Sequence, residues 1–341
     1  MRVGFLAMHY PPEIRGGATF VYRLKHALEE MGVDIKLISH SRVQEADVRI
    51  TPPNIPGKGG YAQLKIIGAV SDVDFVHSFN TGGFFVFNKP VIEHIHHYDF
   101  DWLKWNRLRK YLYIEREKFC YKKAKAVTTL TKTSAEELKR NYGKRKVDII
   151  PCGIDQIERI EPGDPLKIIC TVGSVFEKRK GTEILLGAFE LVRKRFPDAV
   201  LYITGSKFGS APLNLNVTNV KFTGELTEKE MEEYYCKCGI AVVPSLCEGF
   251  GIPVLEAMAH GKALVTTRVG IACDELVHEK DALIVEPGDK IGLAASMIRL
   301  IENENLRGKL VTQGLVTSKR YTWERAAKEC IKVYEYILNG V

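Results

Sequence analysis

Short segments rich in valine and isoleucine alternate with longer segments of helical period, and the alternation runs through the chain twice. In the first half the short apolar segments are 3–7, 33–38, 75–77, 91–95, 126–129 and 147–150, with a helical segment at 19–31. In the second half they are 167–172, 200–204, 220–222, 240–243 and 263–266, with helical segments at 183–195, 227–236 and 254–259. Apolar strands separated by helices are typical of a parallel sheet covered on both faces. The pattern predicts an α/β fold of two doubly wound units in tandem.

The domain boundaries follow from the same alternation and from length. A chain of 341 residues is too long for one comfortable core. The polar stretch 156–165 contains two prolines and a glycine and is typical of a linker. We therefore predict a first domain at 1–157 and a second at 158–321, with a closing helix at about 322–341 that crosses back to the first domain.

The composition is that of an ordinary folded protein, with 45% hydrophobic and 27% charged residues. Eight cysteines are scattered without paired spacing, which favours a reducing compartment over a disulfide framework. The first eight residues read as a buried strand rather than a signal peptide. These features predict a cytoplasmic protein, with a peripheral position on the cytoplasmic membrane face as an open alternative.

Positive charge is concentrated in the first half of the chain. Residues 1–157 hold 25 Lys and Arg against 17 Asp and Glu, whereas residues 158–341 hold 24 against 25. The segment 102–125 has nine Lys or Arg, and Trp102, Trp105, Leu108 and Leu112 recur in it at helical spacing. Such a helix could lie on an anionic membrane surface, or it could pack its apolar stripe on the sheet. No nucleic-acid motif accompanies the charge, so no nucleic-acid partner is expected.

The densest motif spans residues 244–259, directly after the apolar segment 240–243. Gly249 and Gly251 let the backbone approach a ligand closely, and the helix that follows offers free amides to a phosphate. Glu248 precedes that helix and Glu256 lies about one turn inside it, so both carboxylates could flank one ligand and accept hydrogen bonds from sugar hydroxyls. An ordinary capped helix of an α/β protein is the alternative.

This stretch resembles the E-x7-E signature of retaining glycosyltransferases with the two-domain GT-B fold, specifically glycosyltransferase family 4 (GT4). Further blocks resemble the family in the same order: the P-P…G-G loop at 10–18, the block before the linker at 150–155, F-x-G at 222–224, the P-S block at 238–245 and the closing tryptophan helix at Trp323. Cys152 replaces the usual asparagine of the second block.

The resemblance implies transfer of a sugar from a nucleotide-diphosphate sugar to an acceptor hydroxyl on a lipid, a glycan or a small molecule, with no cofactor and no metal. It places Glu256 on the ribose, Glu248 near the sugar or its phosphate, and Gly224 by the base. The expected donor-binding residues are Gly16, Gly17, Ser174, Gly224, Gly249, Phe250, Gly251, Ile252 and Glu256, and the expected catalytic residues are His96, Lys180 and Glu248.

The family holds the donor's diphosphate with an arginine and a lysine in the pattern G-R-x5-K-G. Here residues 173–181 supply Lys180, but Ser174 stands in the place of the arginine. Lys180 would stabilise the charge that a leaving diphosphate gains. Arg179 or Lys178 could partly replace the arginine, although neighbouring residues usually point elsewhere.

In the first domain, the resemblance selects His96 at the end of the segment 91–95, close to the reacting sugar. Three histidines lie within 94–97, but only His94 and His96 share a face of a strand, so a metal site is not expected. Gly16 and Gly17 precede a helix and could bring an amide to the donor phosphate or the acceptor. The D-x-D patterns at 72–74 and 99–101 are treated as incidental.

Three other functions are compatible with two such units. A nucleotide-sugar 2-epimerase would need an acid/base group in the first domain that the sequence does not reveal. A dehydrogenase would need G-x-G-x-x-G after the first strand, which Gly16 and Gly17 do not supply. A sugar-nucleotide sensor without catalysis is favoured by Ser174 and disfavoured by Glu248, Lys180 and His96.

Overall fold

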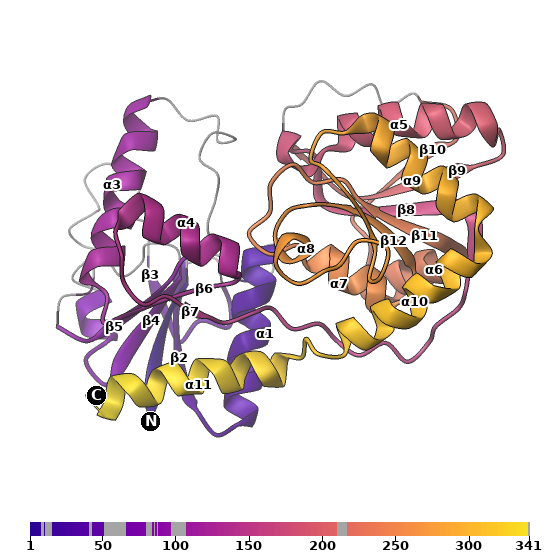
Figure 1. Ribbon diagram of the computed structural model, residues 1–341. Coiled ribbons are helices and arrows are strands. Elements are labelled where there is room, and N and C mark those ends of the chain that lie inside the picture. The colour runs from indigo at the N-terminus through magenta and orange to yellow at the C-terminus, as the bar shows by residue number, and fades with distance from the viewer. Residues whose placement is uncertain are drawn as a thin grey trace. The chain divides into compact units, whose positions relative to one another are not determined.

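The computed structural model describes residues 1–7, 10, 16–40, 43–50, 66–79, 84, 86, 88–96, 107–209 and 217–339. The chain divides into two compact units, one of Met1–Gly153 with Trp323–Val341 and the other of Ile154–Thr322. Each unit is a parallel sheet with helices packed on it (Figure 1). Two doubly wound units in tandem are what the repeated alternation predicts.

The first unit is built on seven parallel strands in the order β3-β2-β1-β4-β5-β6-β7. Their bounds are β1 Arg2–Ala7, β2 Asp34–His40, β3 Val48–Ile50, β4 Phe75–Phe79, β5 Val91–His94, β6 Ala126–Thr129 and β7 Asp148–Ile149. The strand order reverses between β1 and β4, which pair in parallel from Val3 opposite Phe75 to Ala7 opposite Phe79. Loops after such a pair of strands diverge, and ligands of open α/β sheets bind there.

The helices with bounds in the described residues of this unit are α1 Gly16–Glu30, α3 Arg107–Lys123, α4 Lys132–Tyr142 and α11 Trp323–Asn339. The last of them joins the first unit although it closes the chain, and it runs beside α1 (Figure 1). Its buried residues recur at helical spacing, and Tyr334 among them hydrogen-bonds with His77 Nδ1 over 2.8 Å and packs on Phe75. The expected crossing of the closing helix back to the first unit is thereby confirmed.

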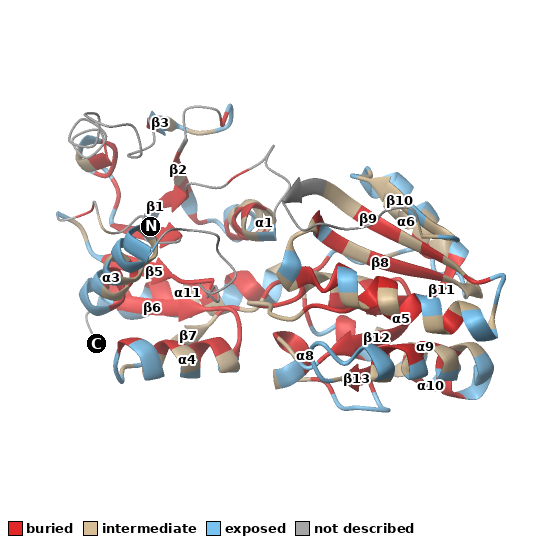
Figure 2. Ribbon diagram, turned by 90° about the horizontal axis from the view of Figure 1, so that it is seen from above, coloured by how far each residue is buried: buried red, intermediate tan, exposed pale blue. Residues whose placement is uncertain are grey.

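The second unit has six parallel strands in the order β10-β9-β8-β11-β12-β13. Their bounds are β8 Asp164–Phe176, β9 Val200–Gly209, β10 Val220–Gly224, β11 Cys238–Val243, β12 Ala263–Thr267 and β13 Leu283–Val285. The helices are α5 Thr182–Arg195, α6 Glu228–Lys237, α7 Ile252–Ala259, α8 Ile271–Asp274, α9 Lys290–Glu302 and α10 Glu304–Ser318. Every residue of β11 and β12 is buried, as expected of central strands covered on both faces (Figure 2). Here the strand order reverses between β8 and β11.

The chain passes from one unit to the other at Gly153–Ile154 and again at Thr322–Trp323. The Ile154 N–H donates to the Tyr321 carbonyl oxygen over 3.1 Å, so the two passages are held side by side.

Several predicted element boundaries are wrong. Strand β8 begins at Asp164, inside the predicted linker, and runs to Phe176, so Ser174 lies in a strand rather than a loop. Its pairing with β9 explains the extra length, because the two strands continue to pair through two shifts of register, as far as Phe176 opposite Gly209. Elements that the sequence did not predict are β3, α4, α8, β13, α9 and α10. The strands among them have only three residues, too few for a periodicity to be seen.

Candidate functional site

Two loops meet at the carboxyl ends of β8 and β11, the strands between which the second sheet reverses order. The loop after β8 forms one 3₁₀ turn, Lys178–Lys180, and the loop after β11 leads into α7. The Leu246 N–H donates to the Arg179 carbonyl oxygen over 2.7 Å. Gly181 has a φ of +68°, and its Cα faces the Pro244 carbonyl so closely that any side chain would collide. These contacts hold the two loops together.

Glu248 is the centre of the charges that these loops bring together. Its Oε1 accepts hydrogen bonds of 2.7 Å from both Lys180 Nζ and the Ser245 hydroxyl, and its Oε2 lies 3.4 Å from Arg179 Nη1. Burial alone would raise the pKa of Glu248, but the charges of Lys180 and Arg179 and the two hydrogen bonds hold that pKa below its usual value. Glu248 is therefore ionised at neutral pH, with the buried Lys180 beside one oxygen and the partly buried Arg179 near the other.

The N-terminus of α7 follows immediately. Gly251 is the N-cap residue with a φ of +94°, no side chain caps the helix there, and Pro253 stands in its first turn. The Phe250 carbonyl oxygen accepts from the Ile271 N–H over 2.7 Å, and the Phe250 ring is buried against Tyr321. Residues 249–252 could therefore contact a ligand through their backbone rather than their side chains. They lie at the positive end of a helix dipole, and the first turn of that helix has no acidic residue.

Glu256 lies one turn further along α7 and is half-buried. Burial, and secondarily the nearby charge of Asp155, raises the pKa of Glu256 to about 7. The two carboxylates of the E-x7-E pattern therefore differ in character, because Lys180 and Arg179 lower the pKa of Glu248 whereas burial and Asp155 raise the pKa of Glu256. A hydroxyl that donates to Glu256 would favour its ionised form.

Two other predicted site residues of the second unit, Gly224 and Ser174, lie on strands. Gly224 ends β10 with a φ of +78°, and no atom of the other described residues lies within 4 Å of where its side chain would begin. Ser174 is buried in β8, paired in register with Ser206 of β9.

His96, Gly16 and Gly17 belong to the first unit. His96 follows β5 and is buried, and its ring meets His94 at 4.7 Å and Phe20 at 5.3 Å between centroids. His94 hydrogen-bonds with Thr128 Oγ1 through Nδ1, and burial holds the pKa of His94 well below its usual value. Phe20 lies on α1, so His96 packs beside the helix that the glycine pair begins.

The prediction that Gly16 and Gly17 precede a helix is wrong, because they are the first two residues of α1. Among the described residues outside its own helix turn, no atom lies within 4 Å of where a Gly16 side chain would begin, and Gly16 itself is exposed. Asp72 of the first D-x-D pattern pairs with Lys36 and Arg2, which is a structural role. The second pattern, at 99–101, lies outside the described residues.

Much of helix α3 is exposed (Figure 2). Leu108 and Leu112 are 66% and 58% exposed, and Tyr111 and Phe119 on the same helix are exposed as well. These four residues recur at i, i+3, i+4 and i+11, so they share a helix face. The alternative hypothesis, that the apolar stripe packs on the sheet, is therefore wrong for Leu108 and Leu112. Trp102 and Trp105 lie outside the described residues.

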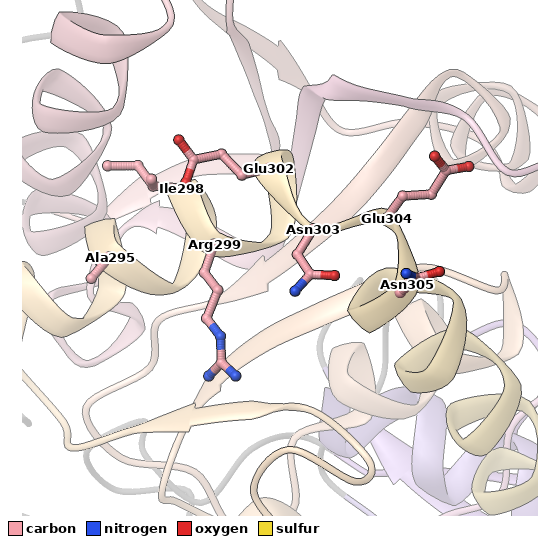
Figure 3. Close-up of a pocket in the computed structure, with 7 residues that line it drawn as sticks. All are labelled: Ala295, Ile298, Arg299, Glu302, Asn303, Glu304 and Asn305. Atoms are coloured by element: carbon pink, nitrogen blue, oxygen red, sulfur yellow. The ribbon is translucent and has the colours of Figure 1, made fainter.

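A pocket lies at the junction of α9 and α10, and Arg299, Glu302, Asn303 and Glu304 are among the residues that line it (Figure 3). Arg299 is paired with Glu279, and Asn303 caps α10 through the Leu306 N–H. Both polar side chains thus have structural roles, and none of the predicted site residues lines this pocket.

Among the described residues, no helix is both long and apolar enough to cross a bilayer. The same part of the chain contains no group of three or more His, Cys, Asp or Glu side chains arranged to hold a metal ion.

Three polar residues around Glu248 and Glu256 have no predicted role. Ser245, Glu177 and Asp155 all lie within the sequence blocks that resemble the family, but the motifs assign no function to them. Glu177 holds Arg179 Nε over 2.7 Å, and the charge of Asp155 acts on Glu256. The only sequence signal was proximity to the motifs themselves.

Comparison with known proteins agrees with the fold and with these motifs. The family model described as "Glycosyltransferase Family 4" matches residues 14–157, and the model described as "Glycosyl transferases group 1" matches residues 166–303. The chain belongs to this glycosyltransferase family.

An uncharacterized glycosyltransferase of Methanocaldococcus jannaschii is 31% identical over 163 residues, which are 47% of this chain and 46% of that protein. The chain spans about half the length of the curated relatives it matches.

Two solved structures are similar over nearly their whole length. Sucrose-phosphate synthase from Thermosynechococcus elongatus has a TM-score of 0.81 at 19% identity, covering 100% of both chains. HepE from Anabaena, in complex with UDP and glucose, has a TM-score of 0.75 at 15% identity, covering 98% of this chain and 99% of that one. These likenesses show the fold, which is of the GT-B type with two Rossmann-like units.

Proposed function

We propose that this protein is a retaining glycosyltransferase that moves a sugar from a nucleoside-diphosphate sugar to an acceptor hydroxyl. The observation that carries the proposal is the Lys180–Glu248 pair beside the uncapped N-terminus of α7. A buried ammonium group and the positive end of a helix dipole at one sheet edge suit a diphosphate that gains negative charge as it leaves. The bound UDP of the similar HepE structure supports a nucleoside diphosphate as this ligand.

The proposal gives each predicted residue except Ser174 a role. In the second unit, Lys180 and the amides of residues 249–252 hold the diphosphate, Glu248 accepts from the sugar or orients its phosphate, and Glu256 accepts from the ribose. Gly224 leaves room for the base. The first unit contributes His96 and the backbone at Gly16 and Gly17. Because side chains and amides supply the positive charge, the proposal includes no metal and no other cofactor.

Retention follows in this proposal from attack on the same face of the sugar that the diphosphate leaves. The acceptor oxygen bonds to the anomeric carbon as the bond to the diphosphate breaks, and the departing phosphate oxygen takes the acceptor's proton. Lys180 acts by stabilising that oxygen as it becomes negative.

Nucleoside diphosphates are the first test. We expect at least one of UDP, GDP and ADP to raise the melting temperature, because a ligand at a hundred times its Kd stabilises the folded state by about 2.7 kcal/mol. With the matching nucleotide sugar and an acceptor, the product's anomeric proton should show the donor's configuration by NMR. Inverted product would contradict the same-face mechanism. Binding without transfer would support the sensor, and an epimerised sugar without acceptor would support the 2-epimerase.

For the acceptor side, we propose that α3 rests on an anionic membrane surface, which favours a lipid-linked acceptor. The exposed face of Leu108, Tyr111, Leu112 and Phe119 can enter the headgroup region while the Lys and Arg of the same helix meet lipid phosphates.

Vesicle sedimentation tests this membrane contact. The protein should bind phosphatidylglycerol vesicles at low salt and dissociate as salt screens the attraction. Leu112→Glu should reduce binding about tenfold, the scale for one exposed leucine kept out of the membrane. Ile291→Glu is a matched control, since Ile291 is 63% exposed on α9 of the other unit. Equal binding by both variants, or no binding at low salt, would reject α3 as the contact.

A further inference from the structure

We propose that Arg179 is a second cation of the diphosphate site and binds a phosphate oxygen alongside Lys180. This inference rests on the proposed function and adds a ligand-binding residue that sequence reasoning expected to point elsewhere.

The geometry that points to Arg179 is a carboxylate shared by two cations. Lys180 Nζ lies 2.7 Å from Glu248 Oε1, and Arg179 Nη1 lies 3.4 Å from Oε2 of the same carboxylate. Successive residues of a 3₁₀ turn diverge by about 120°, so two neighbours would not ordinarily reach one group. Here the arginine side chain is long enough to bring Nη1 to within 3.4 Å of Glu248 Oε2 despite that divergence.

Glu177 aims the guanidinium group. Arg179 Nε donates to Glu177 Oε1 over 2.7 Å and Nη2 donates to Oε2 over 3.2 Å, a two-point contact that fixes the plane of the group. The turn is fixed as well, because the Lys180 N–H donates to the Glu177 carbonyl oxygen and the Arg179 carbonyl oxygen accepts from Leu246. Arg179 is thus oriented by the fold, with only a fifth of its side chain exposed.

Ser174 cannot supply this charge. It is buried within β8 and carries only a hydroxyl. With Glu248 ionised, Lys180 alone would leave the site without net positive charge toward a diphosphate of charge −2 or more. Arg179 provides a second positive charge, and its planar fork of five N–H donors can bind a phosphate oxygen while keeping its carboxylate contacts. Glu177, 41% exposed, offsets that charge less because water screens it.

The test compares UDP with UMP, or GDP or ADP with its monophosphate where that base stabilises the wild type better. Arg179→Ala and Arg179→Gln should weaken diphosphate binding by about 10- to 100-fold by titration calorimetry, the scale for one charged hydrogen bond. Monophosphate binding should fall much less. Lys178→Ala removes the same charge from an exposed residue of the same turn and should change either Kd less than twofold.

The outcomes separate the inference from the proposed function. A wild type that binds no nucleoside diphosphate overturns both. Diphosphate binding that survives Arg179→Ala and Arg179→Gln overturns the inference alone. Equal losses for diphosphate and monophosphate, with a lower melting temperature before ligand is added, would reduce Arg179 to a structural partner of Glu177 and Glu248.

Discussion

Lys180→Ala is expected to lower turnover by roughly 10²–10³-fold, the scale for losing one fixed group that stabilises charge in a transition state. Nucleoside-diphosphate affinity should fall much less. The difference arises because the leaving diphosphate carries more negative charge in the transition state than in the bound donor, so the ammonium group stabilises the transition state more. Lys180→Arg keeps the charge but changes its geometry and should recover activity only in part.

The measurement is single-turnover transfer at saturating donor, paired with the Kd of the nucleoside diphosphate. Since Lys180 also neutralises the buried Glu248, each variant's melting temperature must be recorded, and Lys178→Ala controls for loss of charge in the turn. Equal losses in affinity and turnover would reduce Lys180 to a group that only binds the donor. No transfer by the wild type to any tested acceptor would strengthen the sensor hypothesis.

The fold could be predicted because its signals are local. Central strands such as β11 and β12 are buried on both faces, so their sequences are continuous apolar runs bounded by polar loops. The loops that hold Lys180 and Glu248 follow such strands directly, and strand order alone then places both loops at one sheet edge. The end of β8 could not be predicted in this way. Its length depends on pairing with β9, and the sequence of β8 alone carries no information about that pairing.

The side-chain arrangement of the site was harder to predict. Arg179 is turned toward Glu248 by its contact with Glu177 and by the hydrogen bond from Leu246. Arg179 and Glu248 are 69 residues apart in the sequence, so their contact has no local signal. For helix α3 the sequence pattern is ambiguous. The same apolar spacing is expected whether the helix packs on the sheet or contacts a membrane, and the exposure of Leu108 and Leu112 distinguishes the two hypotheses.

Glu256→Gln is expected to stabilise the ligand-free protein and weaken its nucleotide binding. The pKa of Glu256 is raised to about 7 in the folded protein, against an ordinary value of 4.5 when unfolded. Folding therefore favours the protonated form, and the stability linked to it is complete below pH 4.5 and lost as the pH rises through 7. A shift of this size corresponds to about 3 kcal/mol, and the remaining solvent contact of this half-buried group lowers it to the order of 2 kcal/mol.

At pH 8 the glutamine variant should therefore have a free energy of unfolding on the order of 2 kcal/mol above the wild type, and the gap should close toward pH 4.5. Chemical denaturation at both pH values measures it, with Glu190→Gln, an exposed glutamate on α5, as the matched control. Nucleoside-diphosphate affinity should fall about tenfold or more, since a hydrogen bond to a charged acceptor is worth about 1.5–3 kcal/mol. In the wild type that affinity should rise from pH 6 to pH 8 as Glu256 ionises. A variant no more stable at pH 8 would refute the raised pKa, and unchanged affinity would remove Glu256 from the ribose.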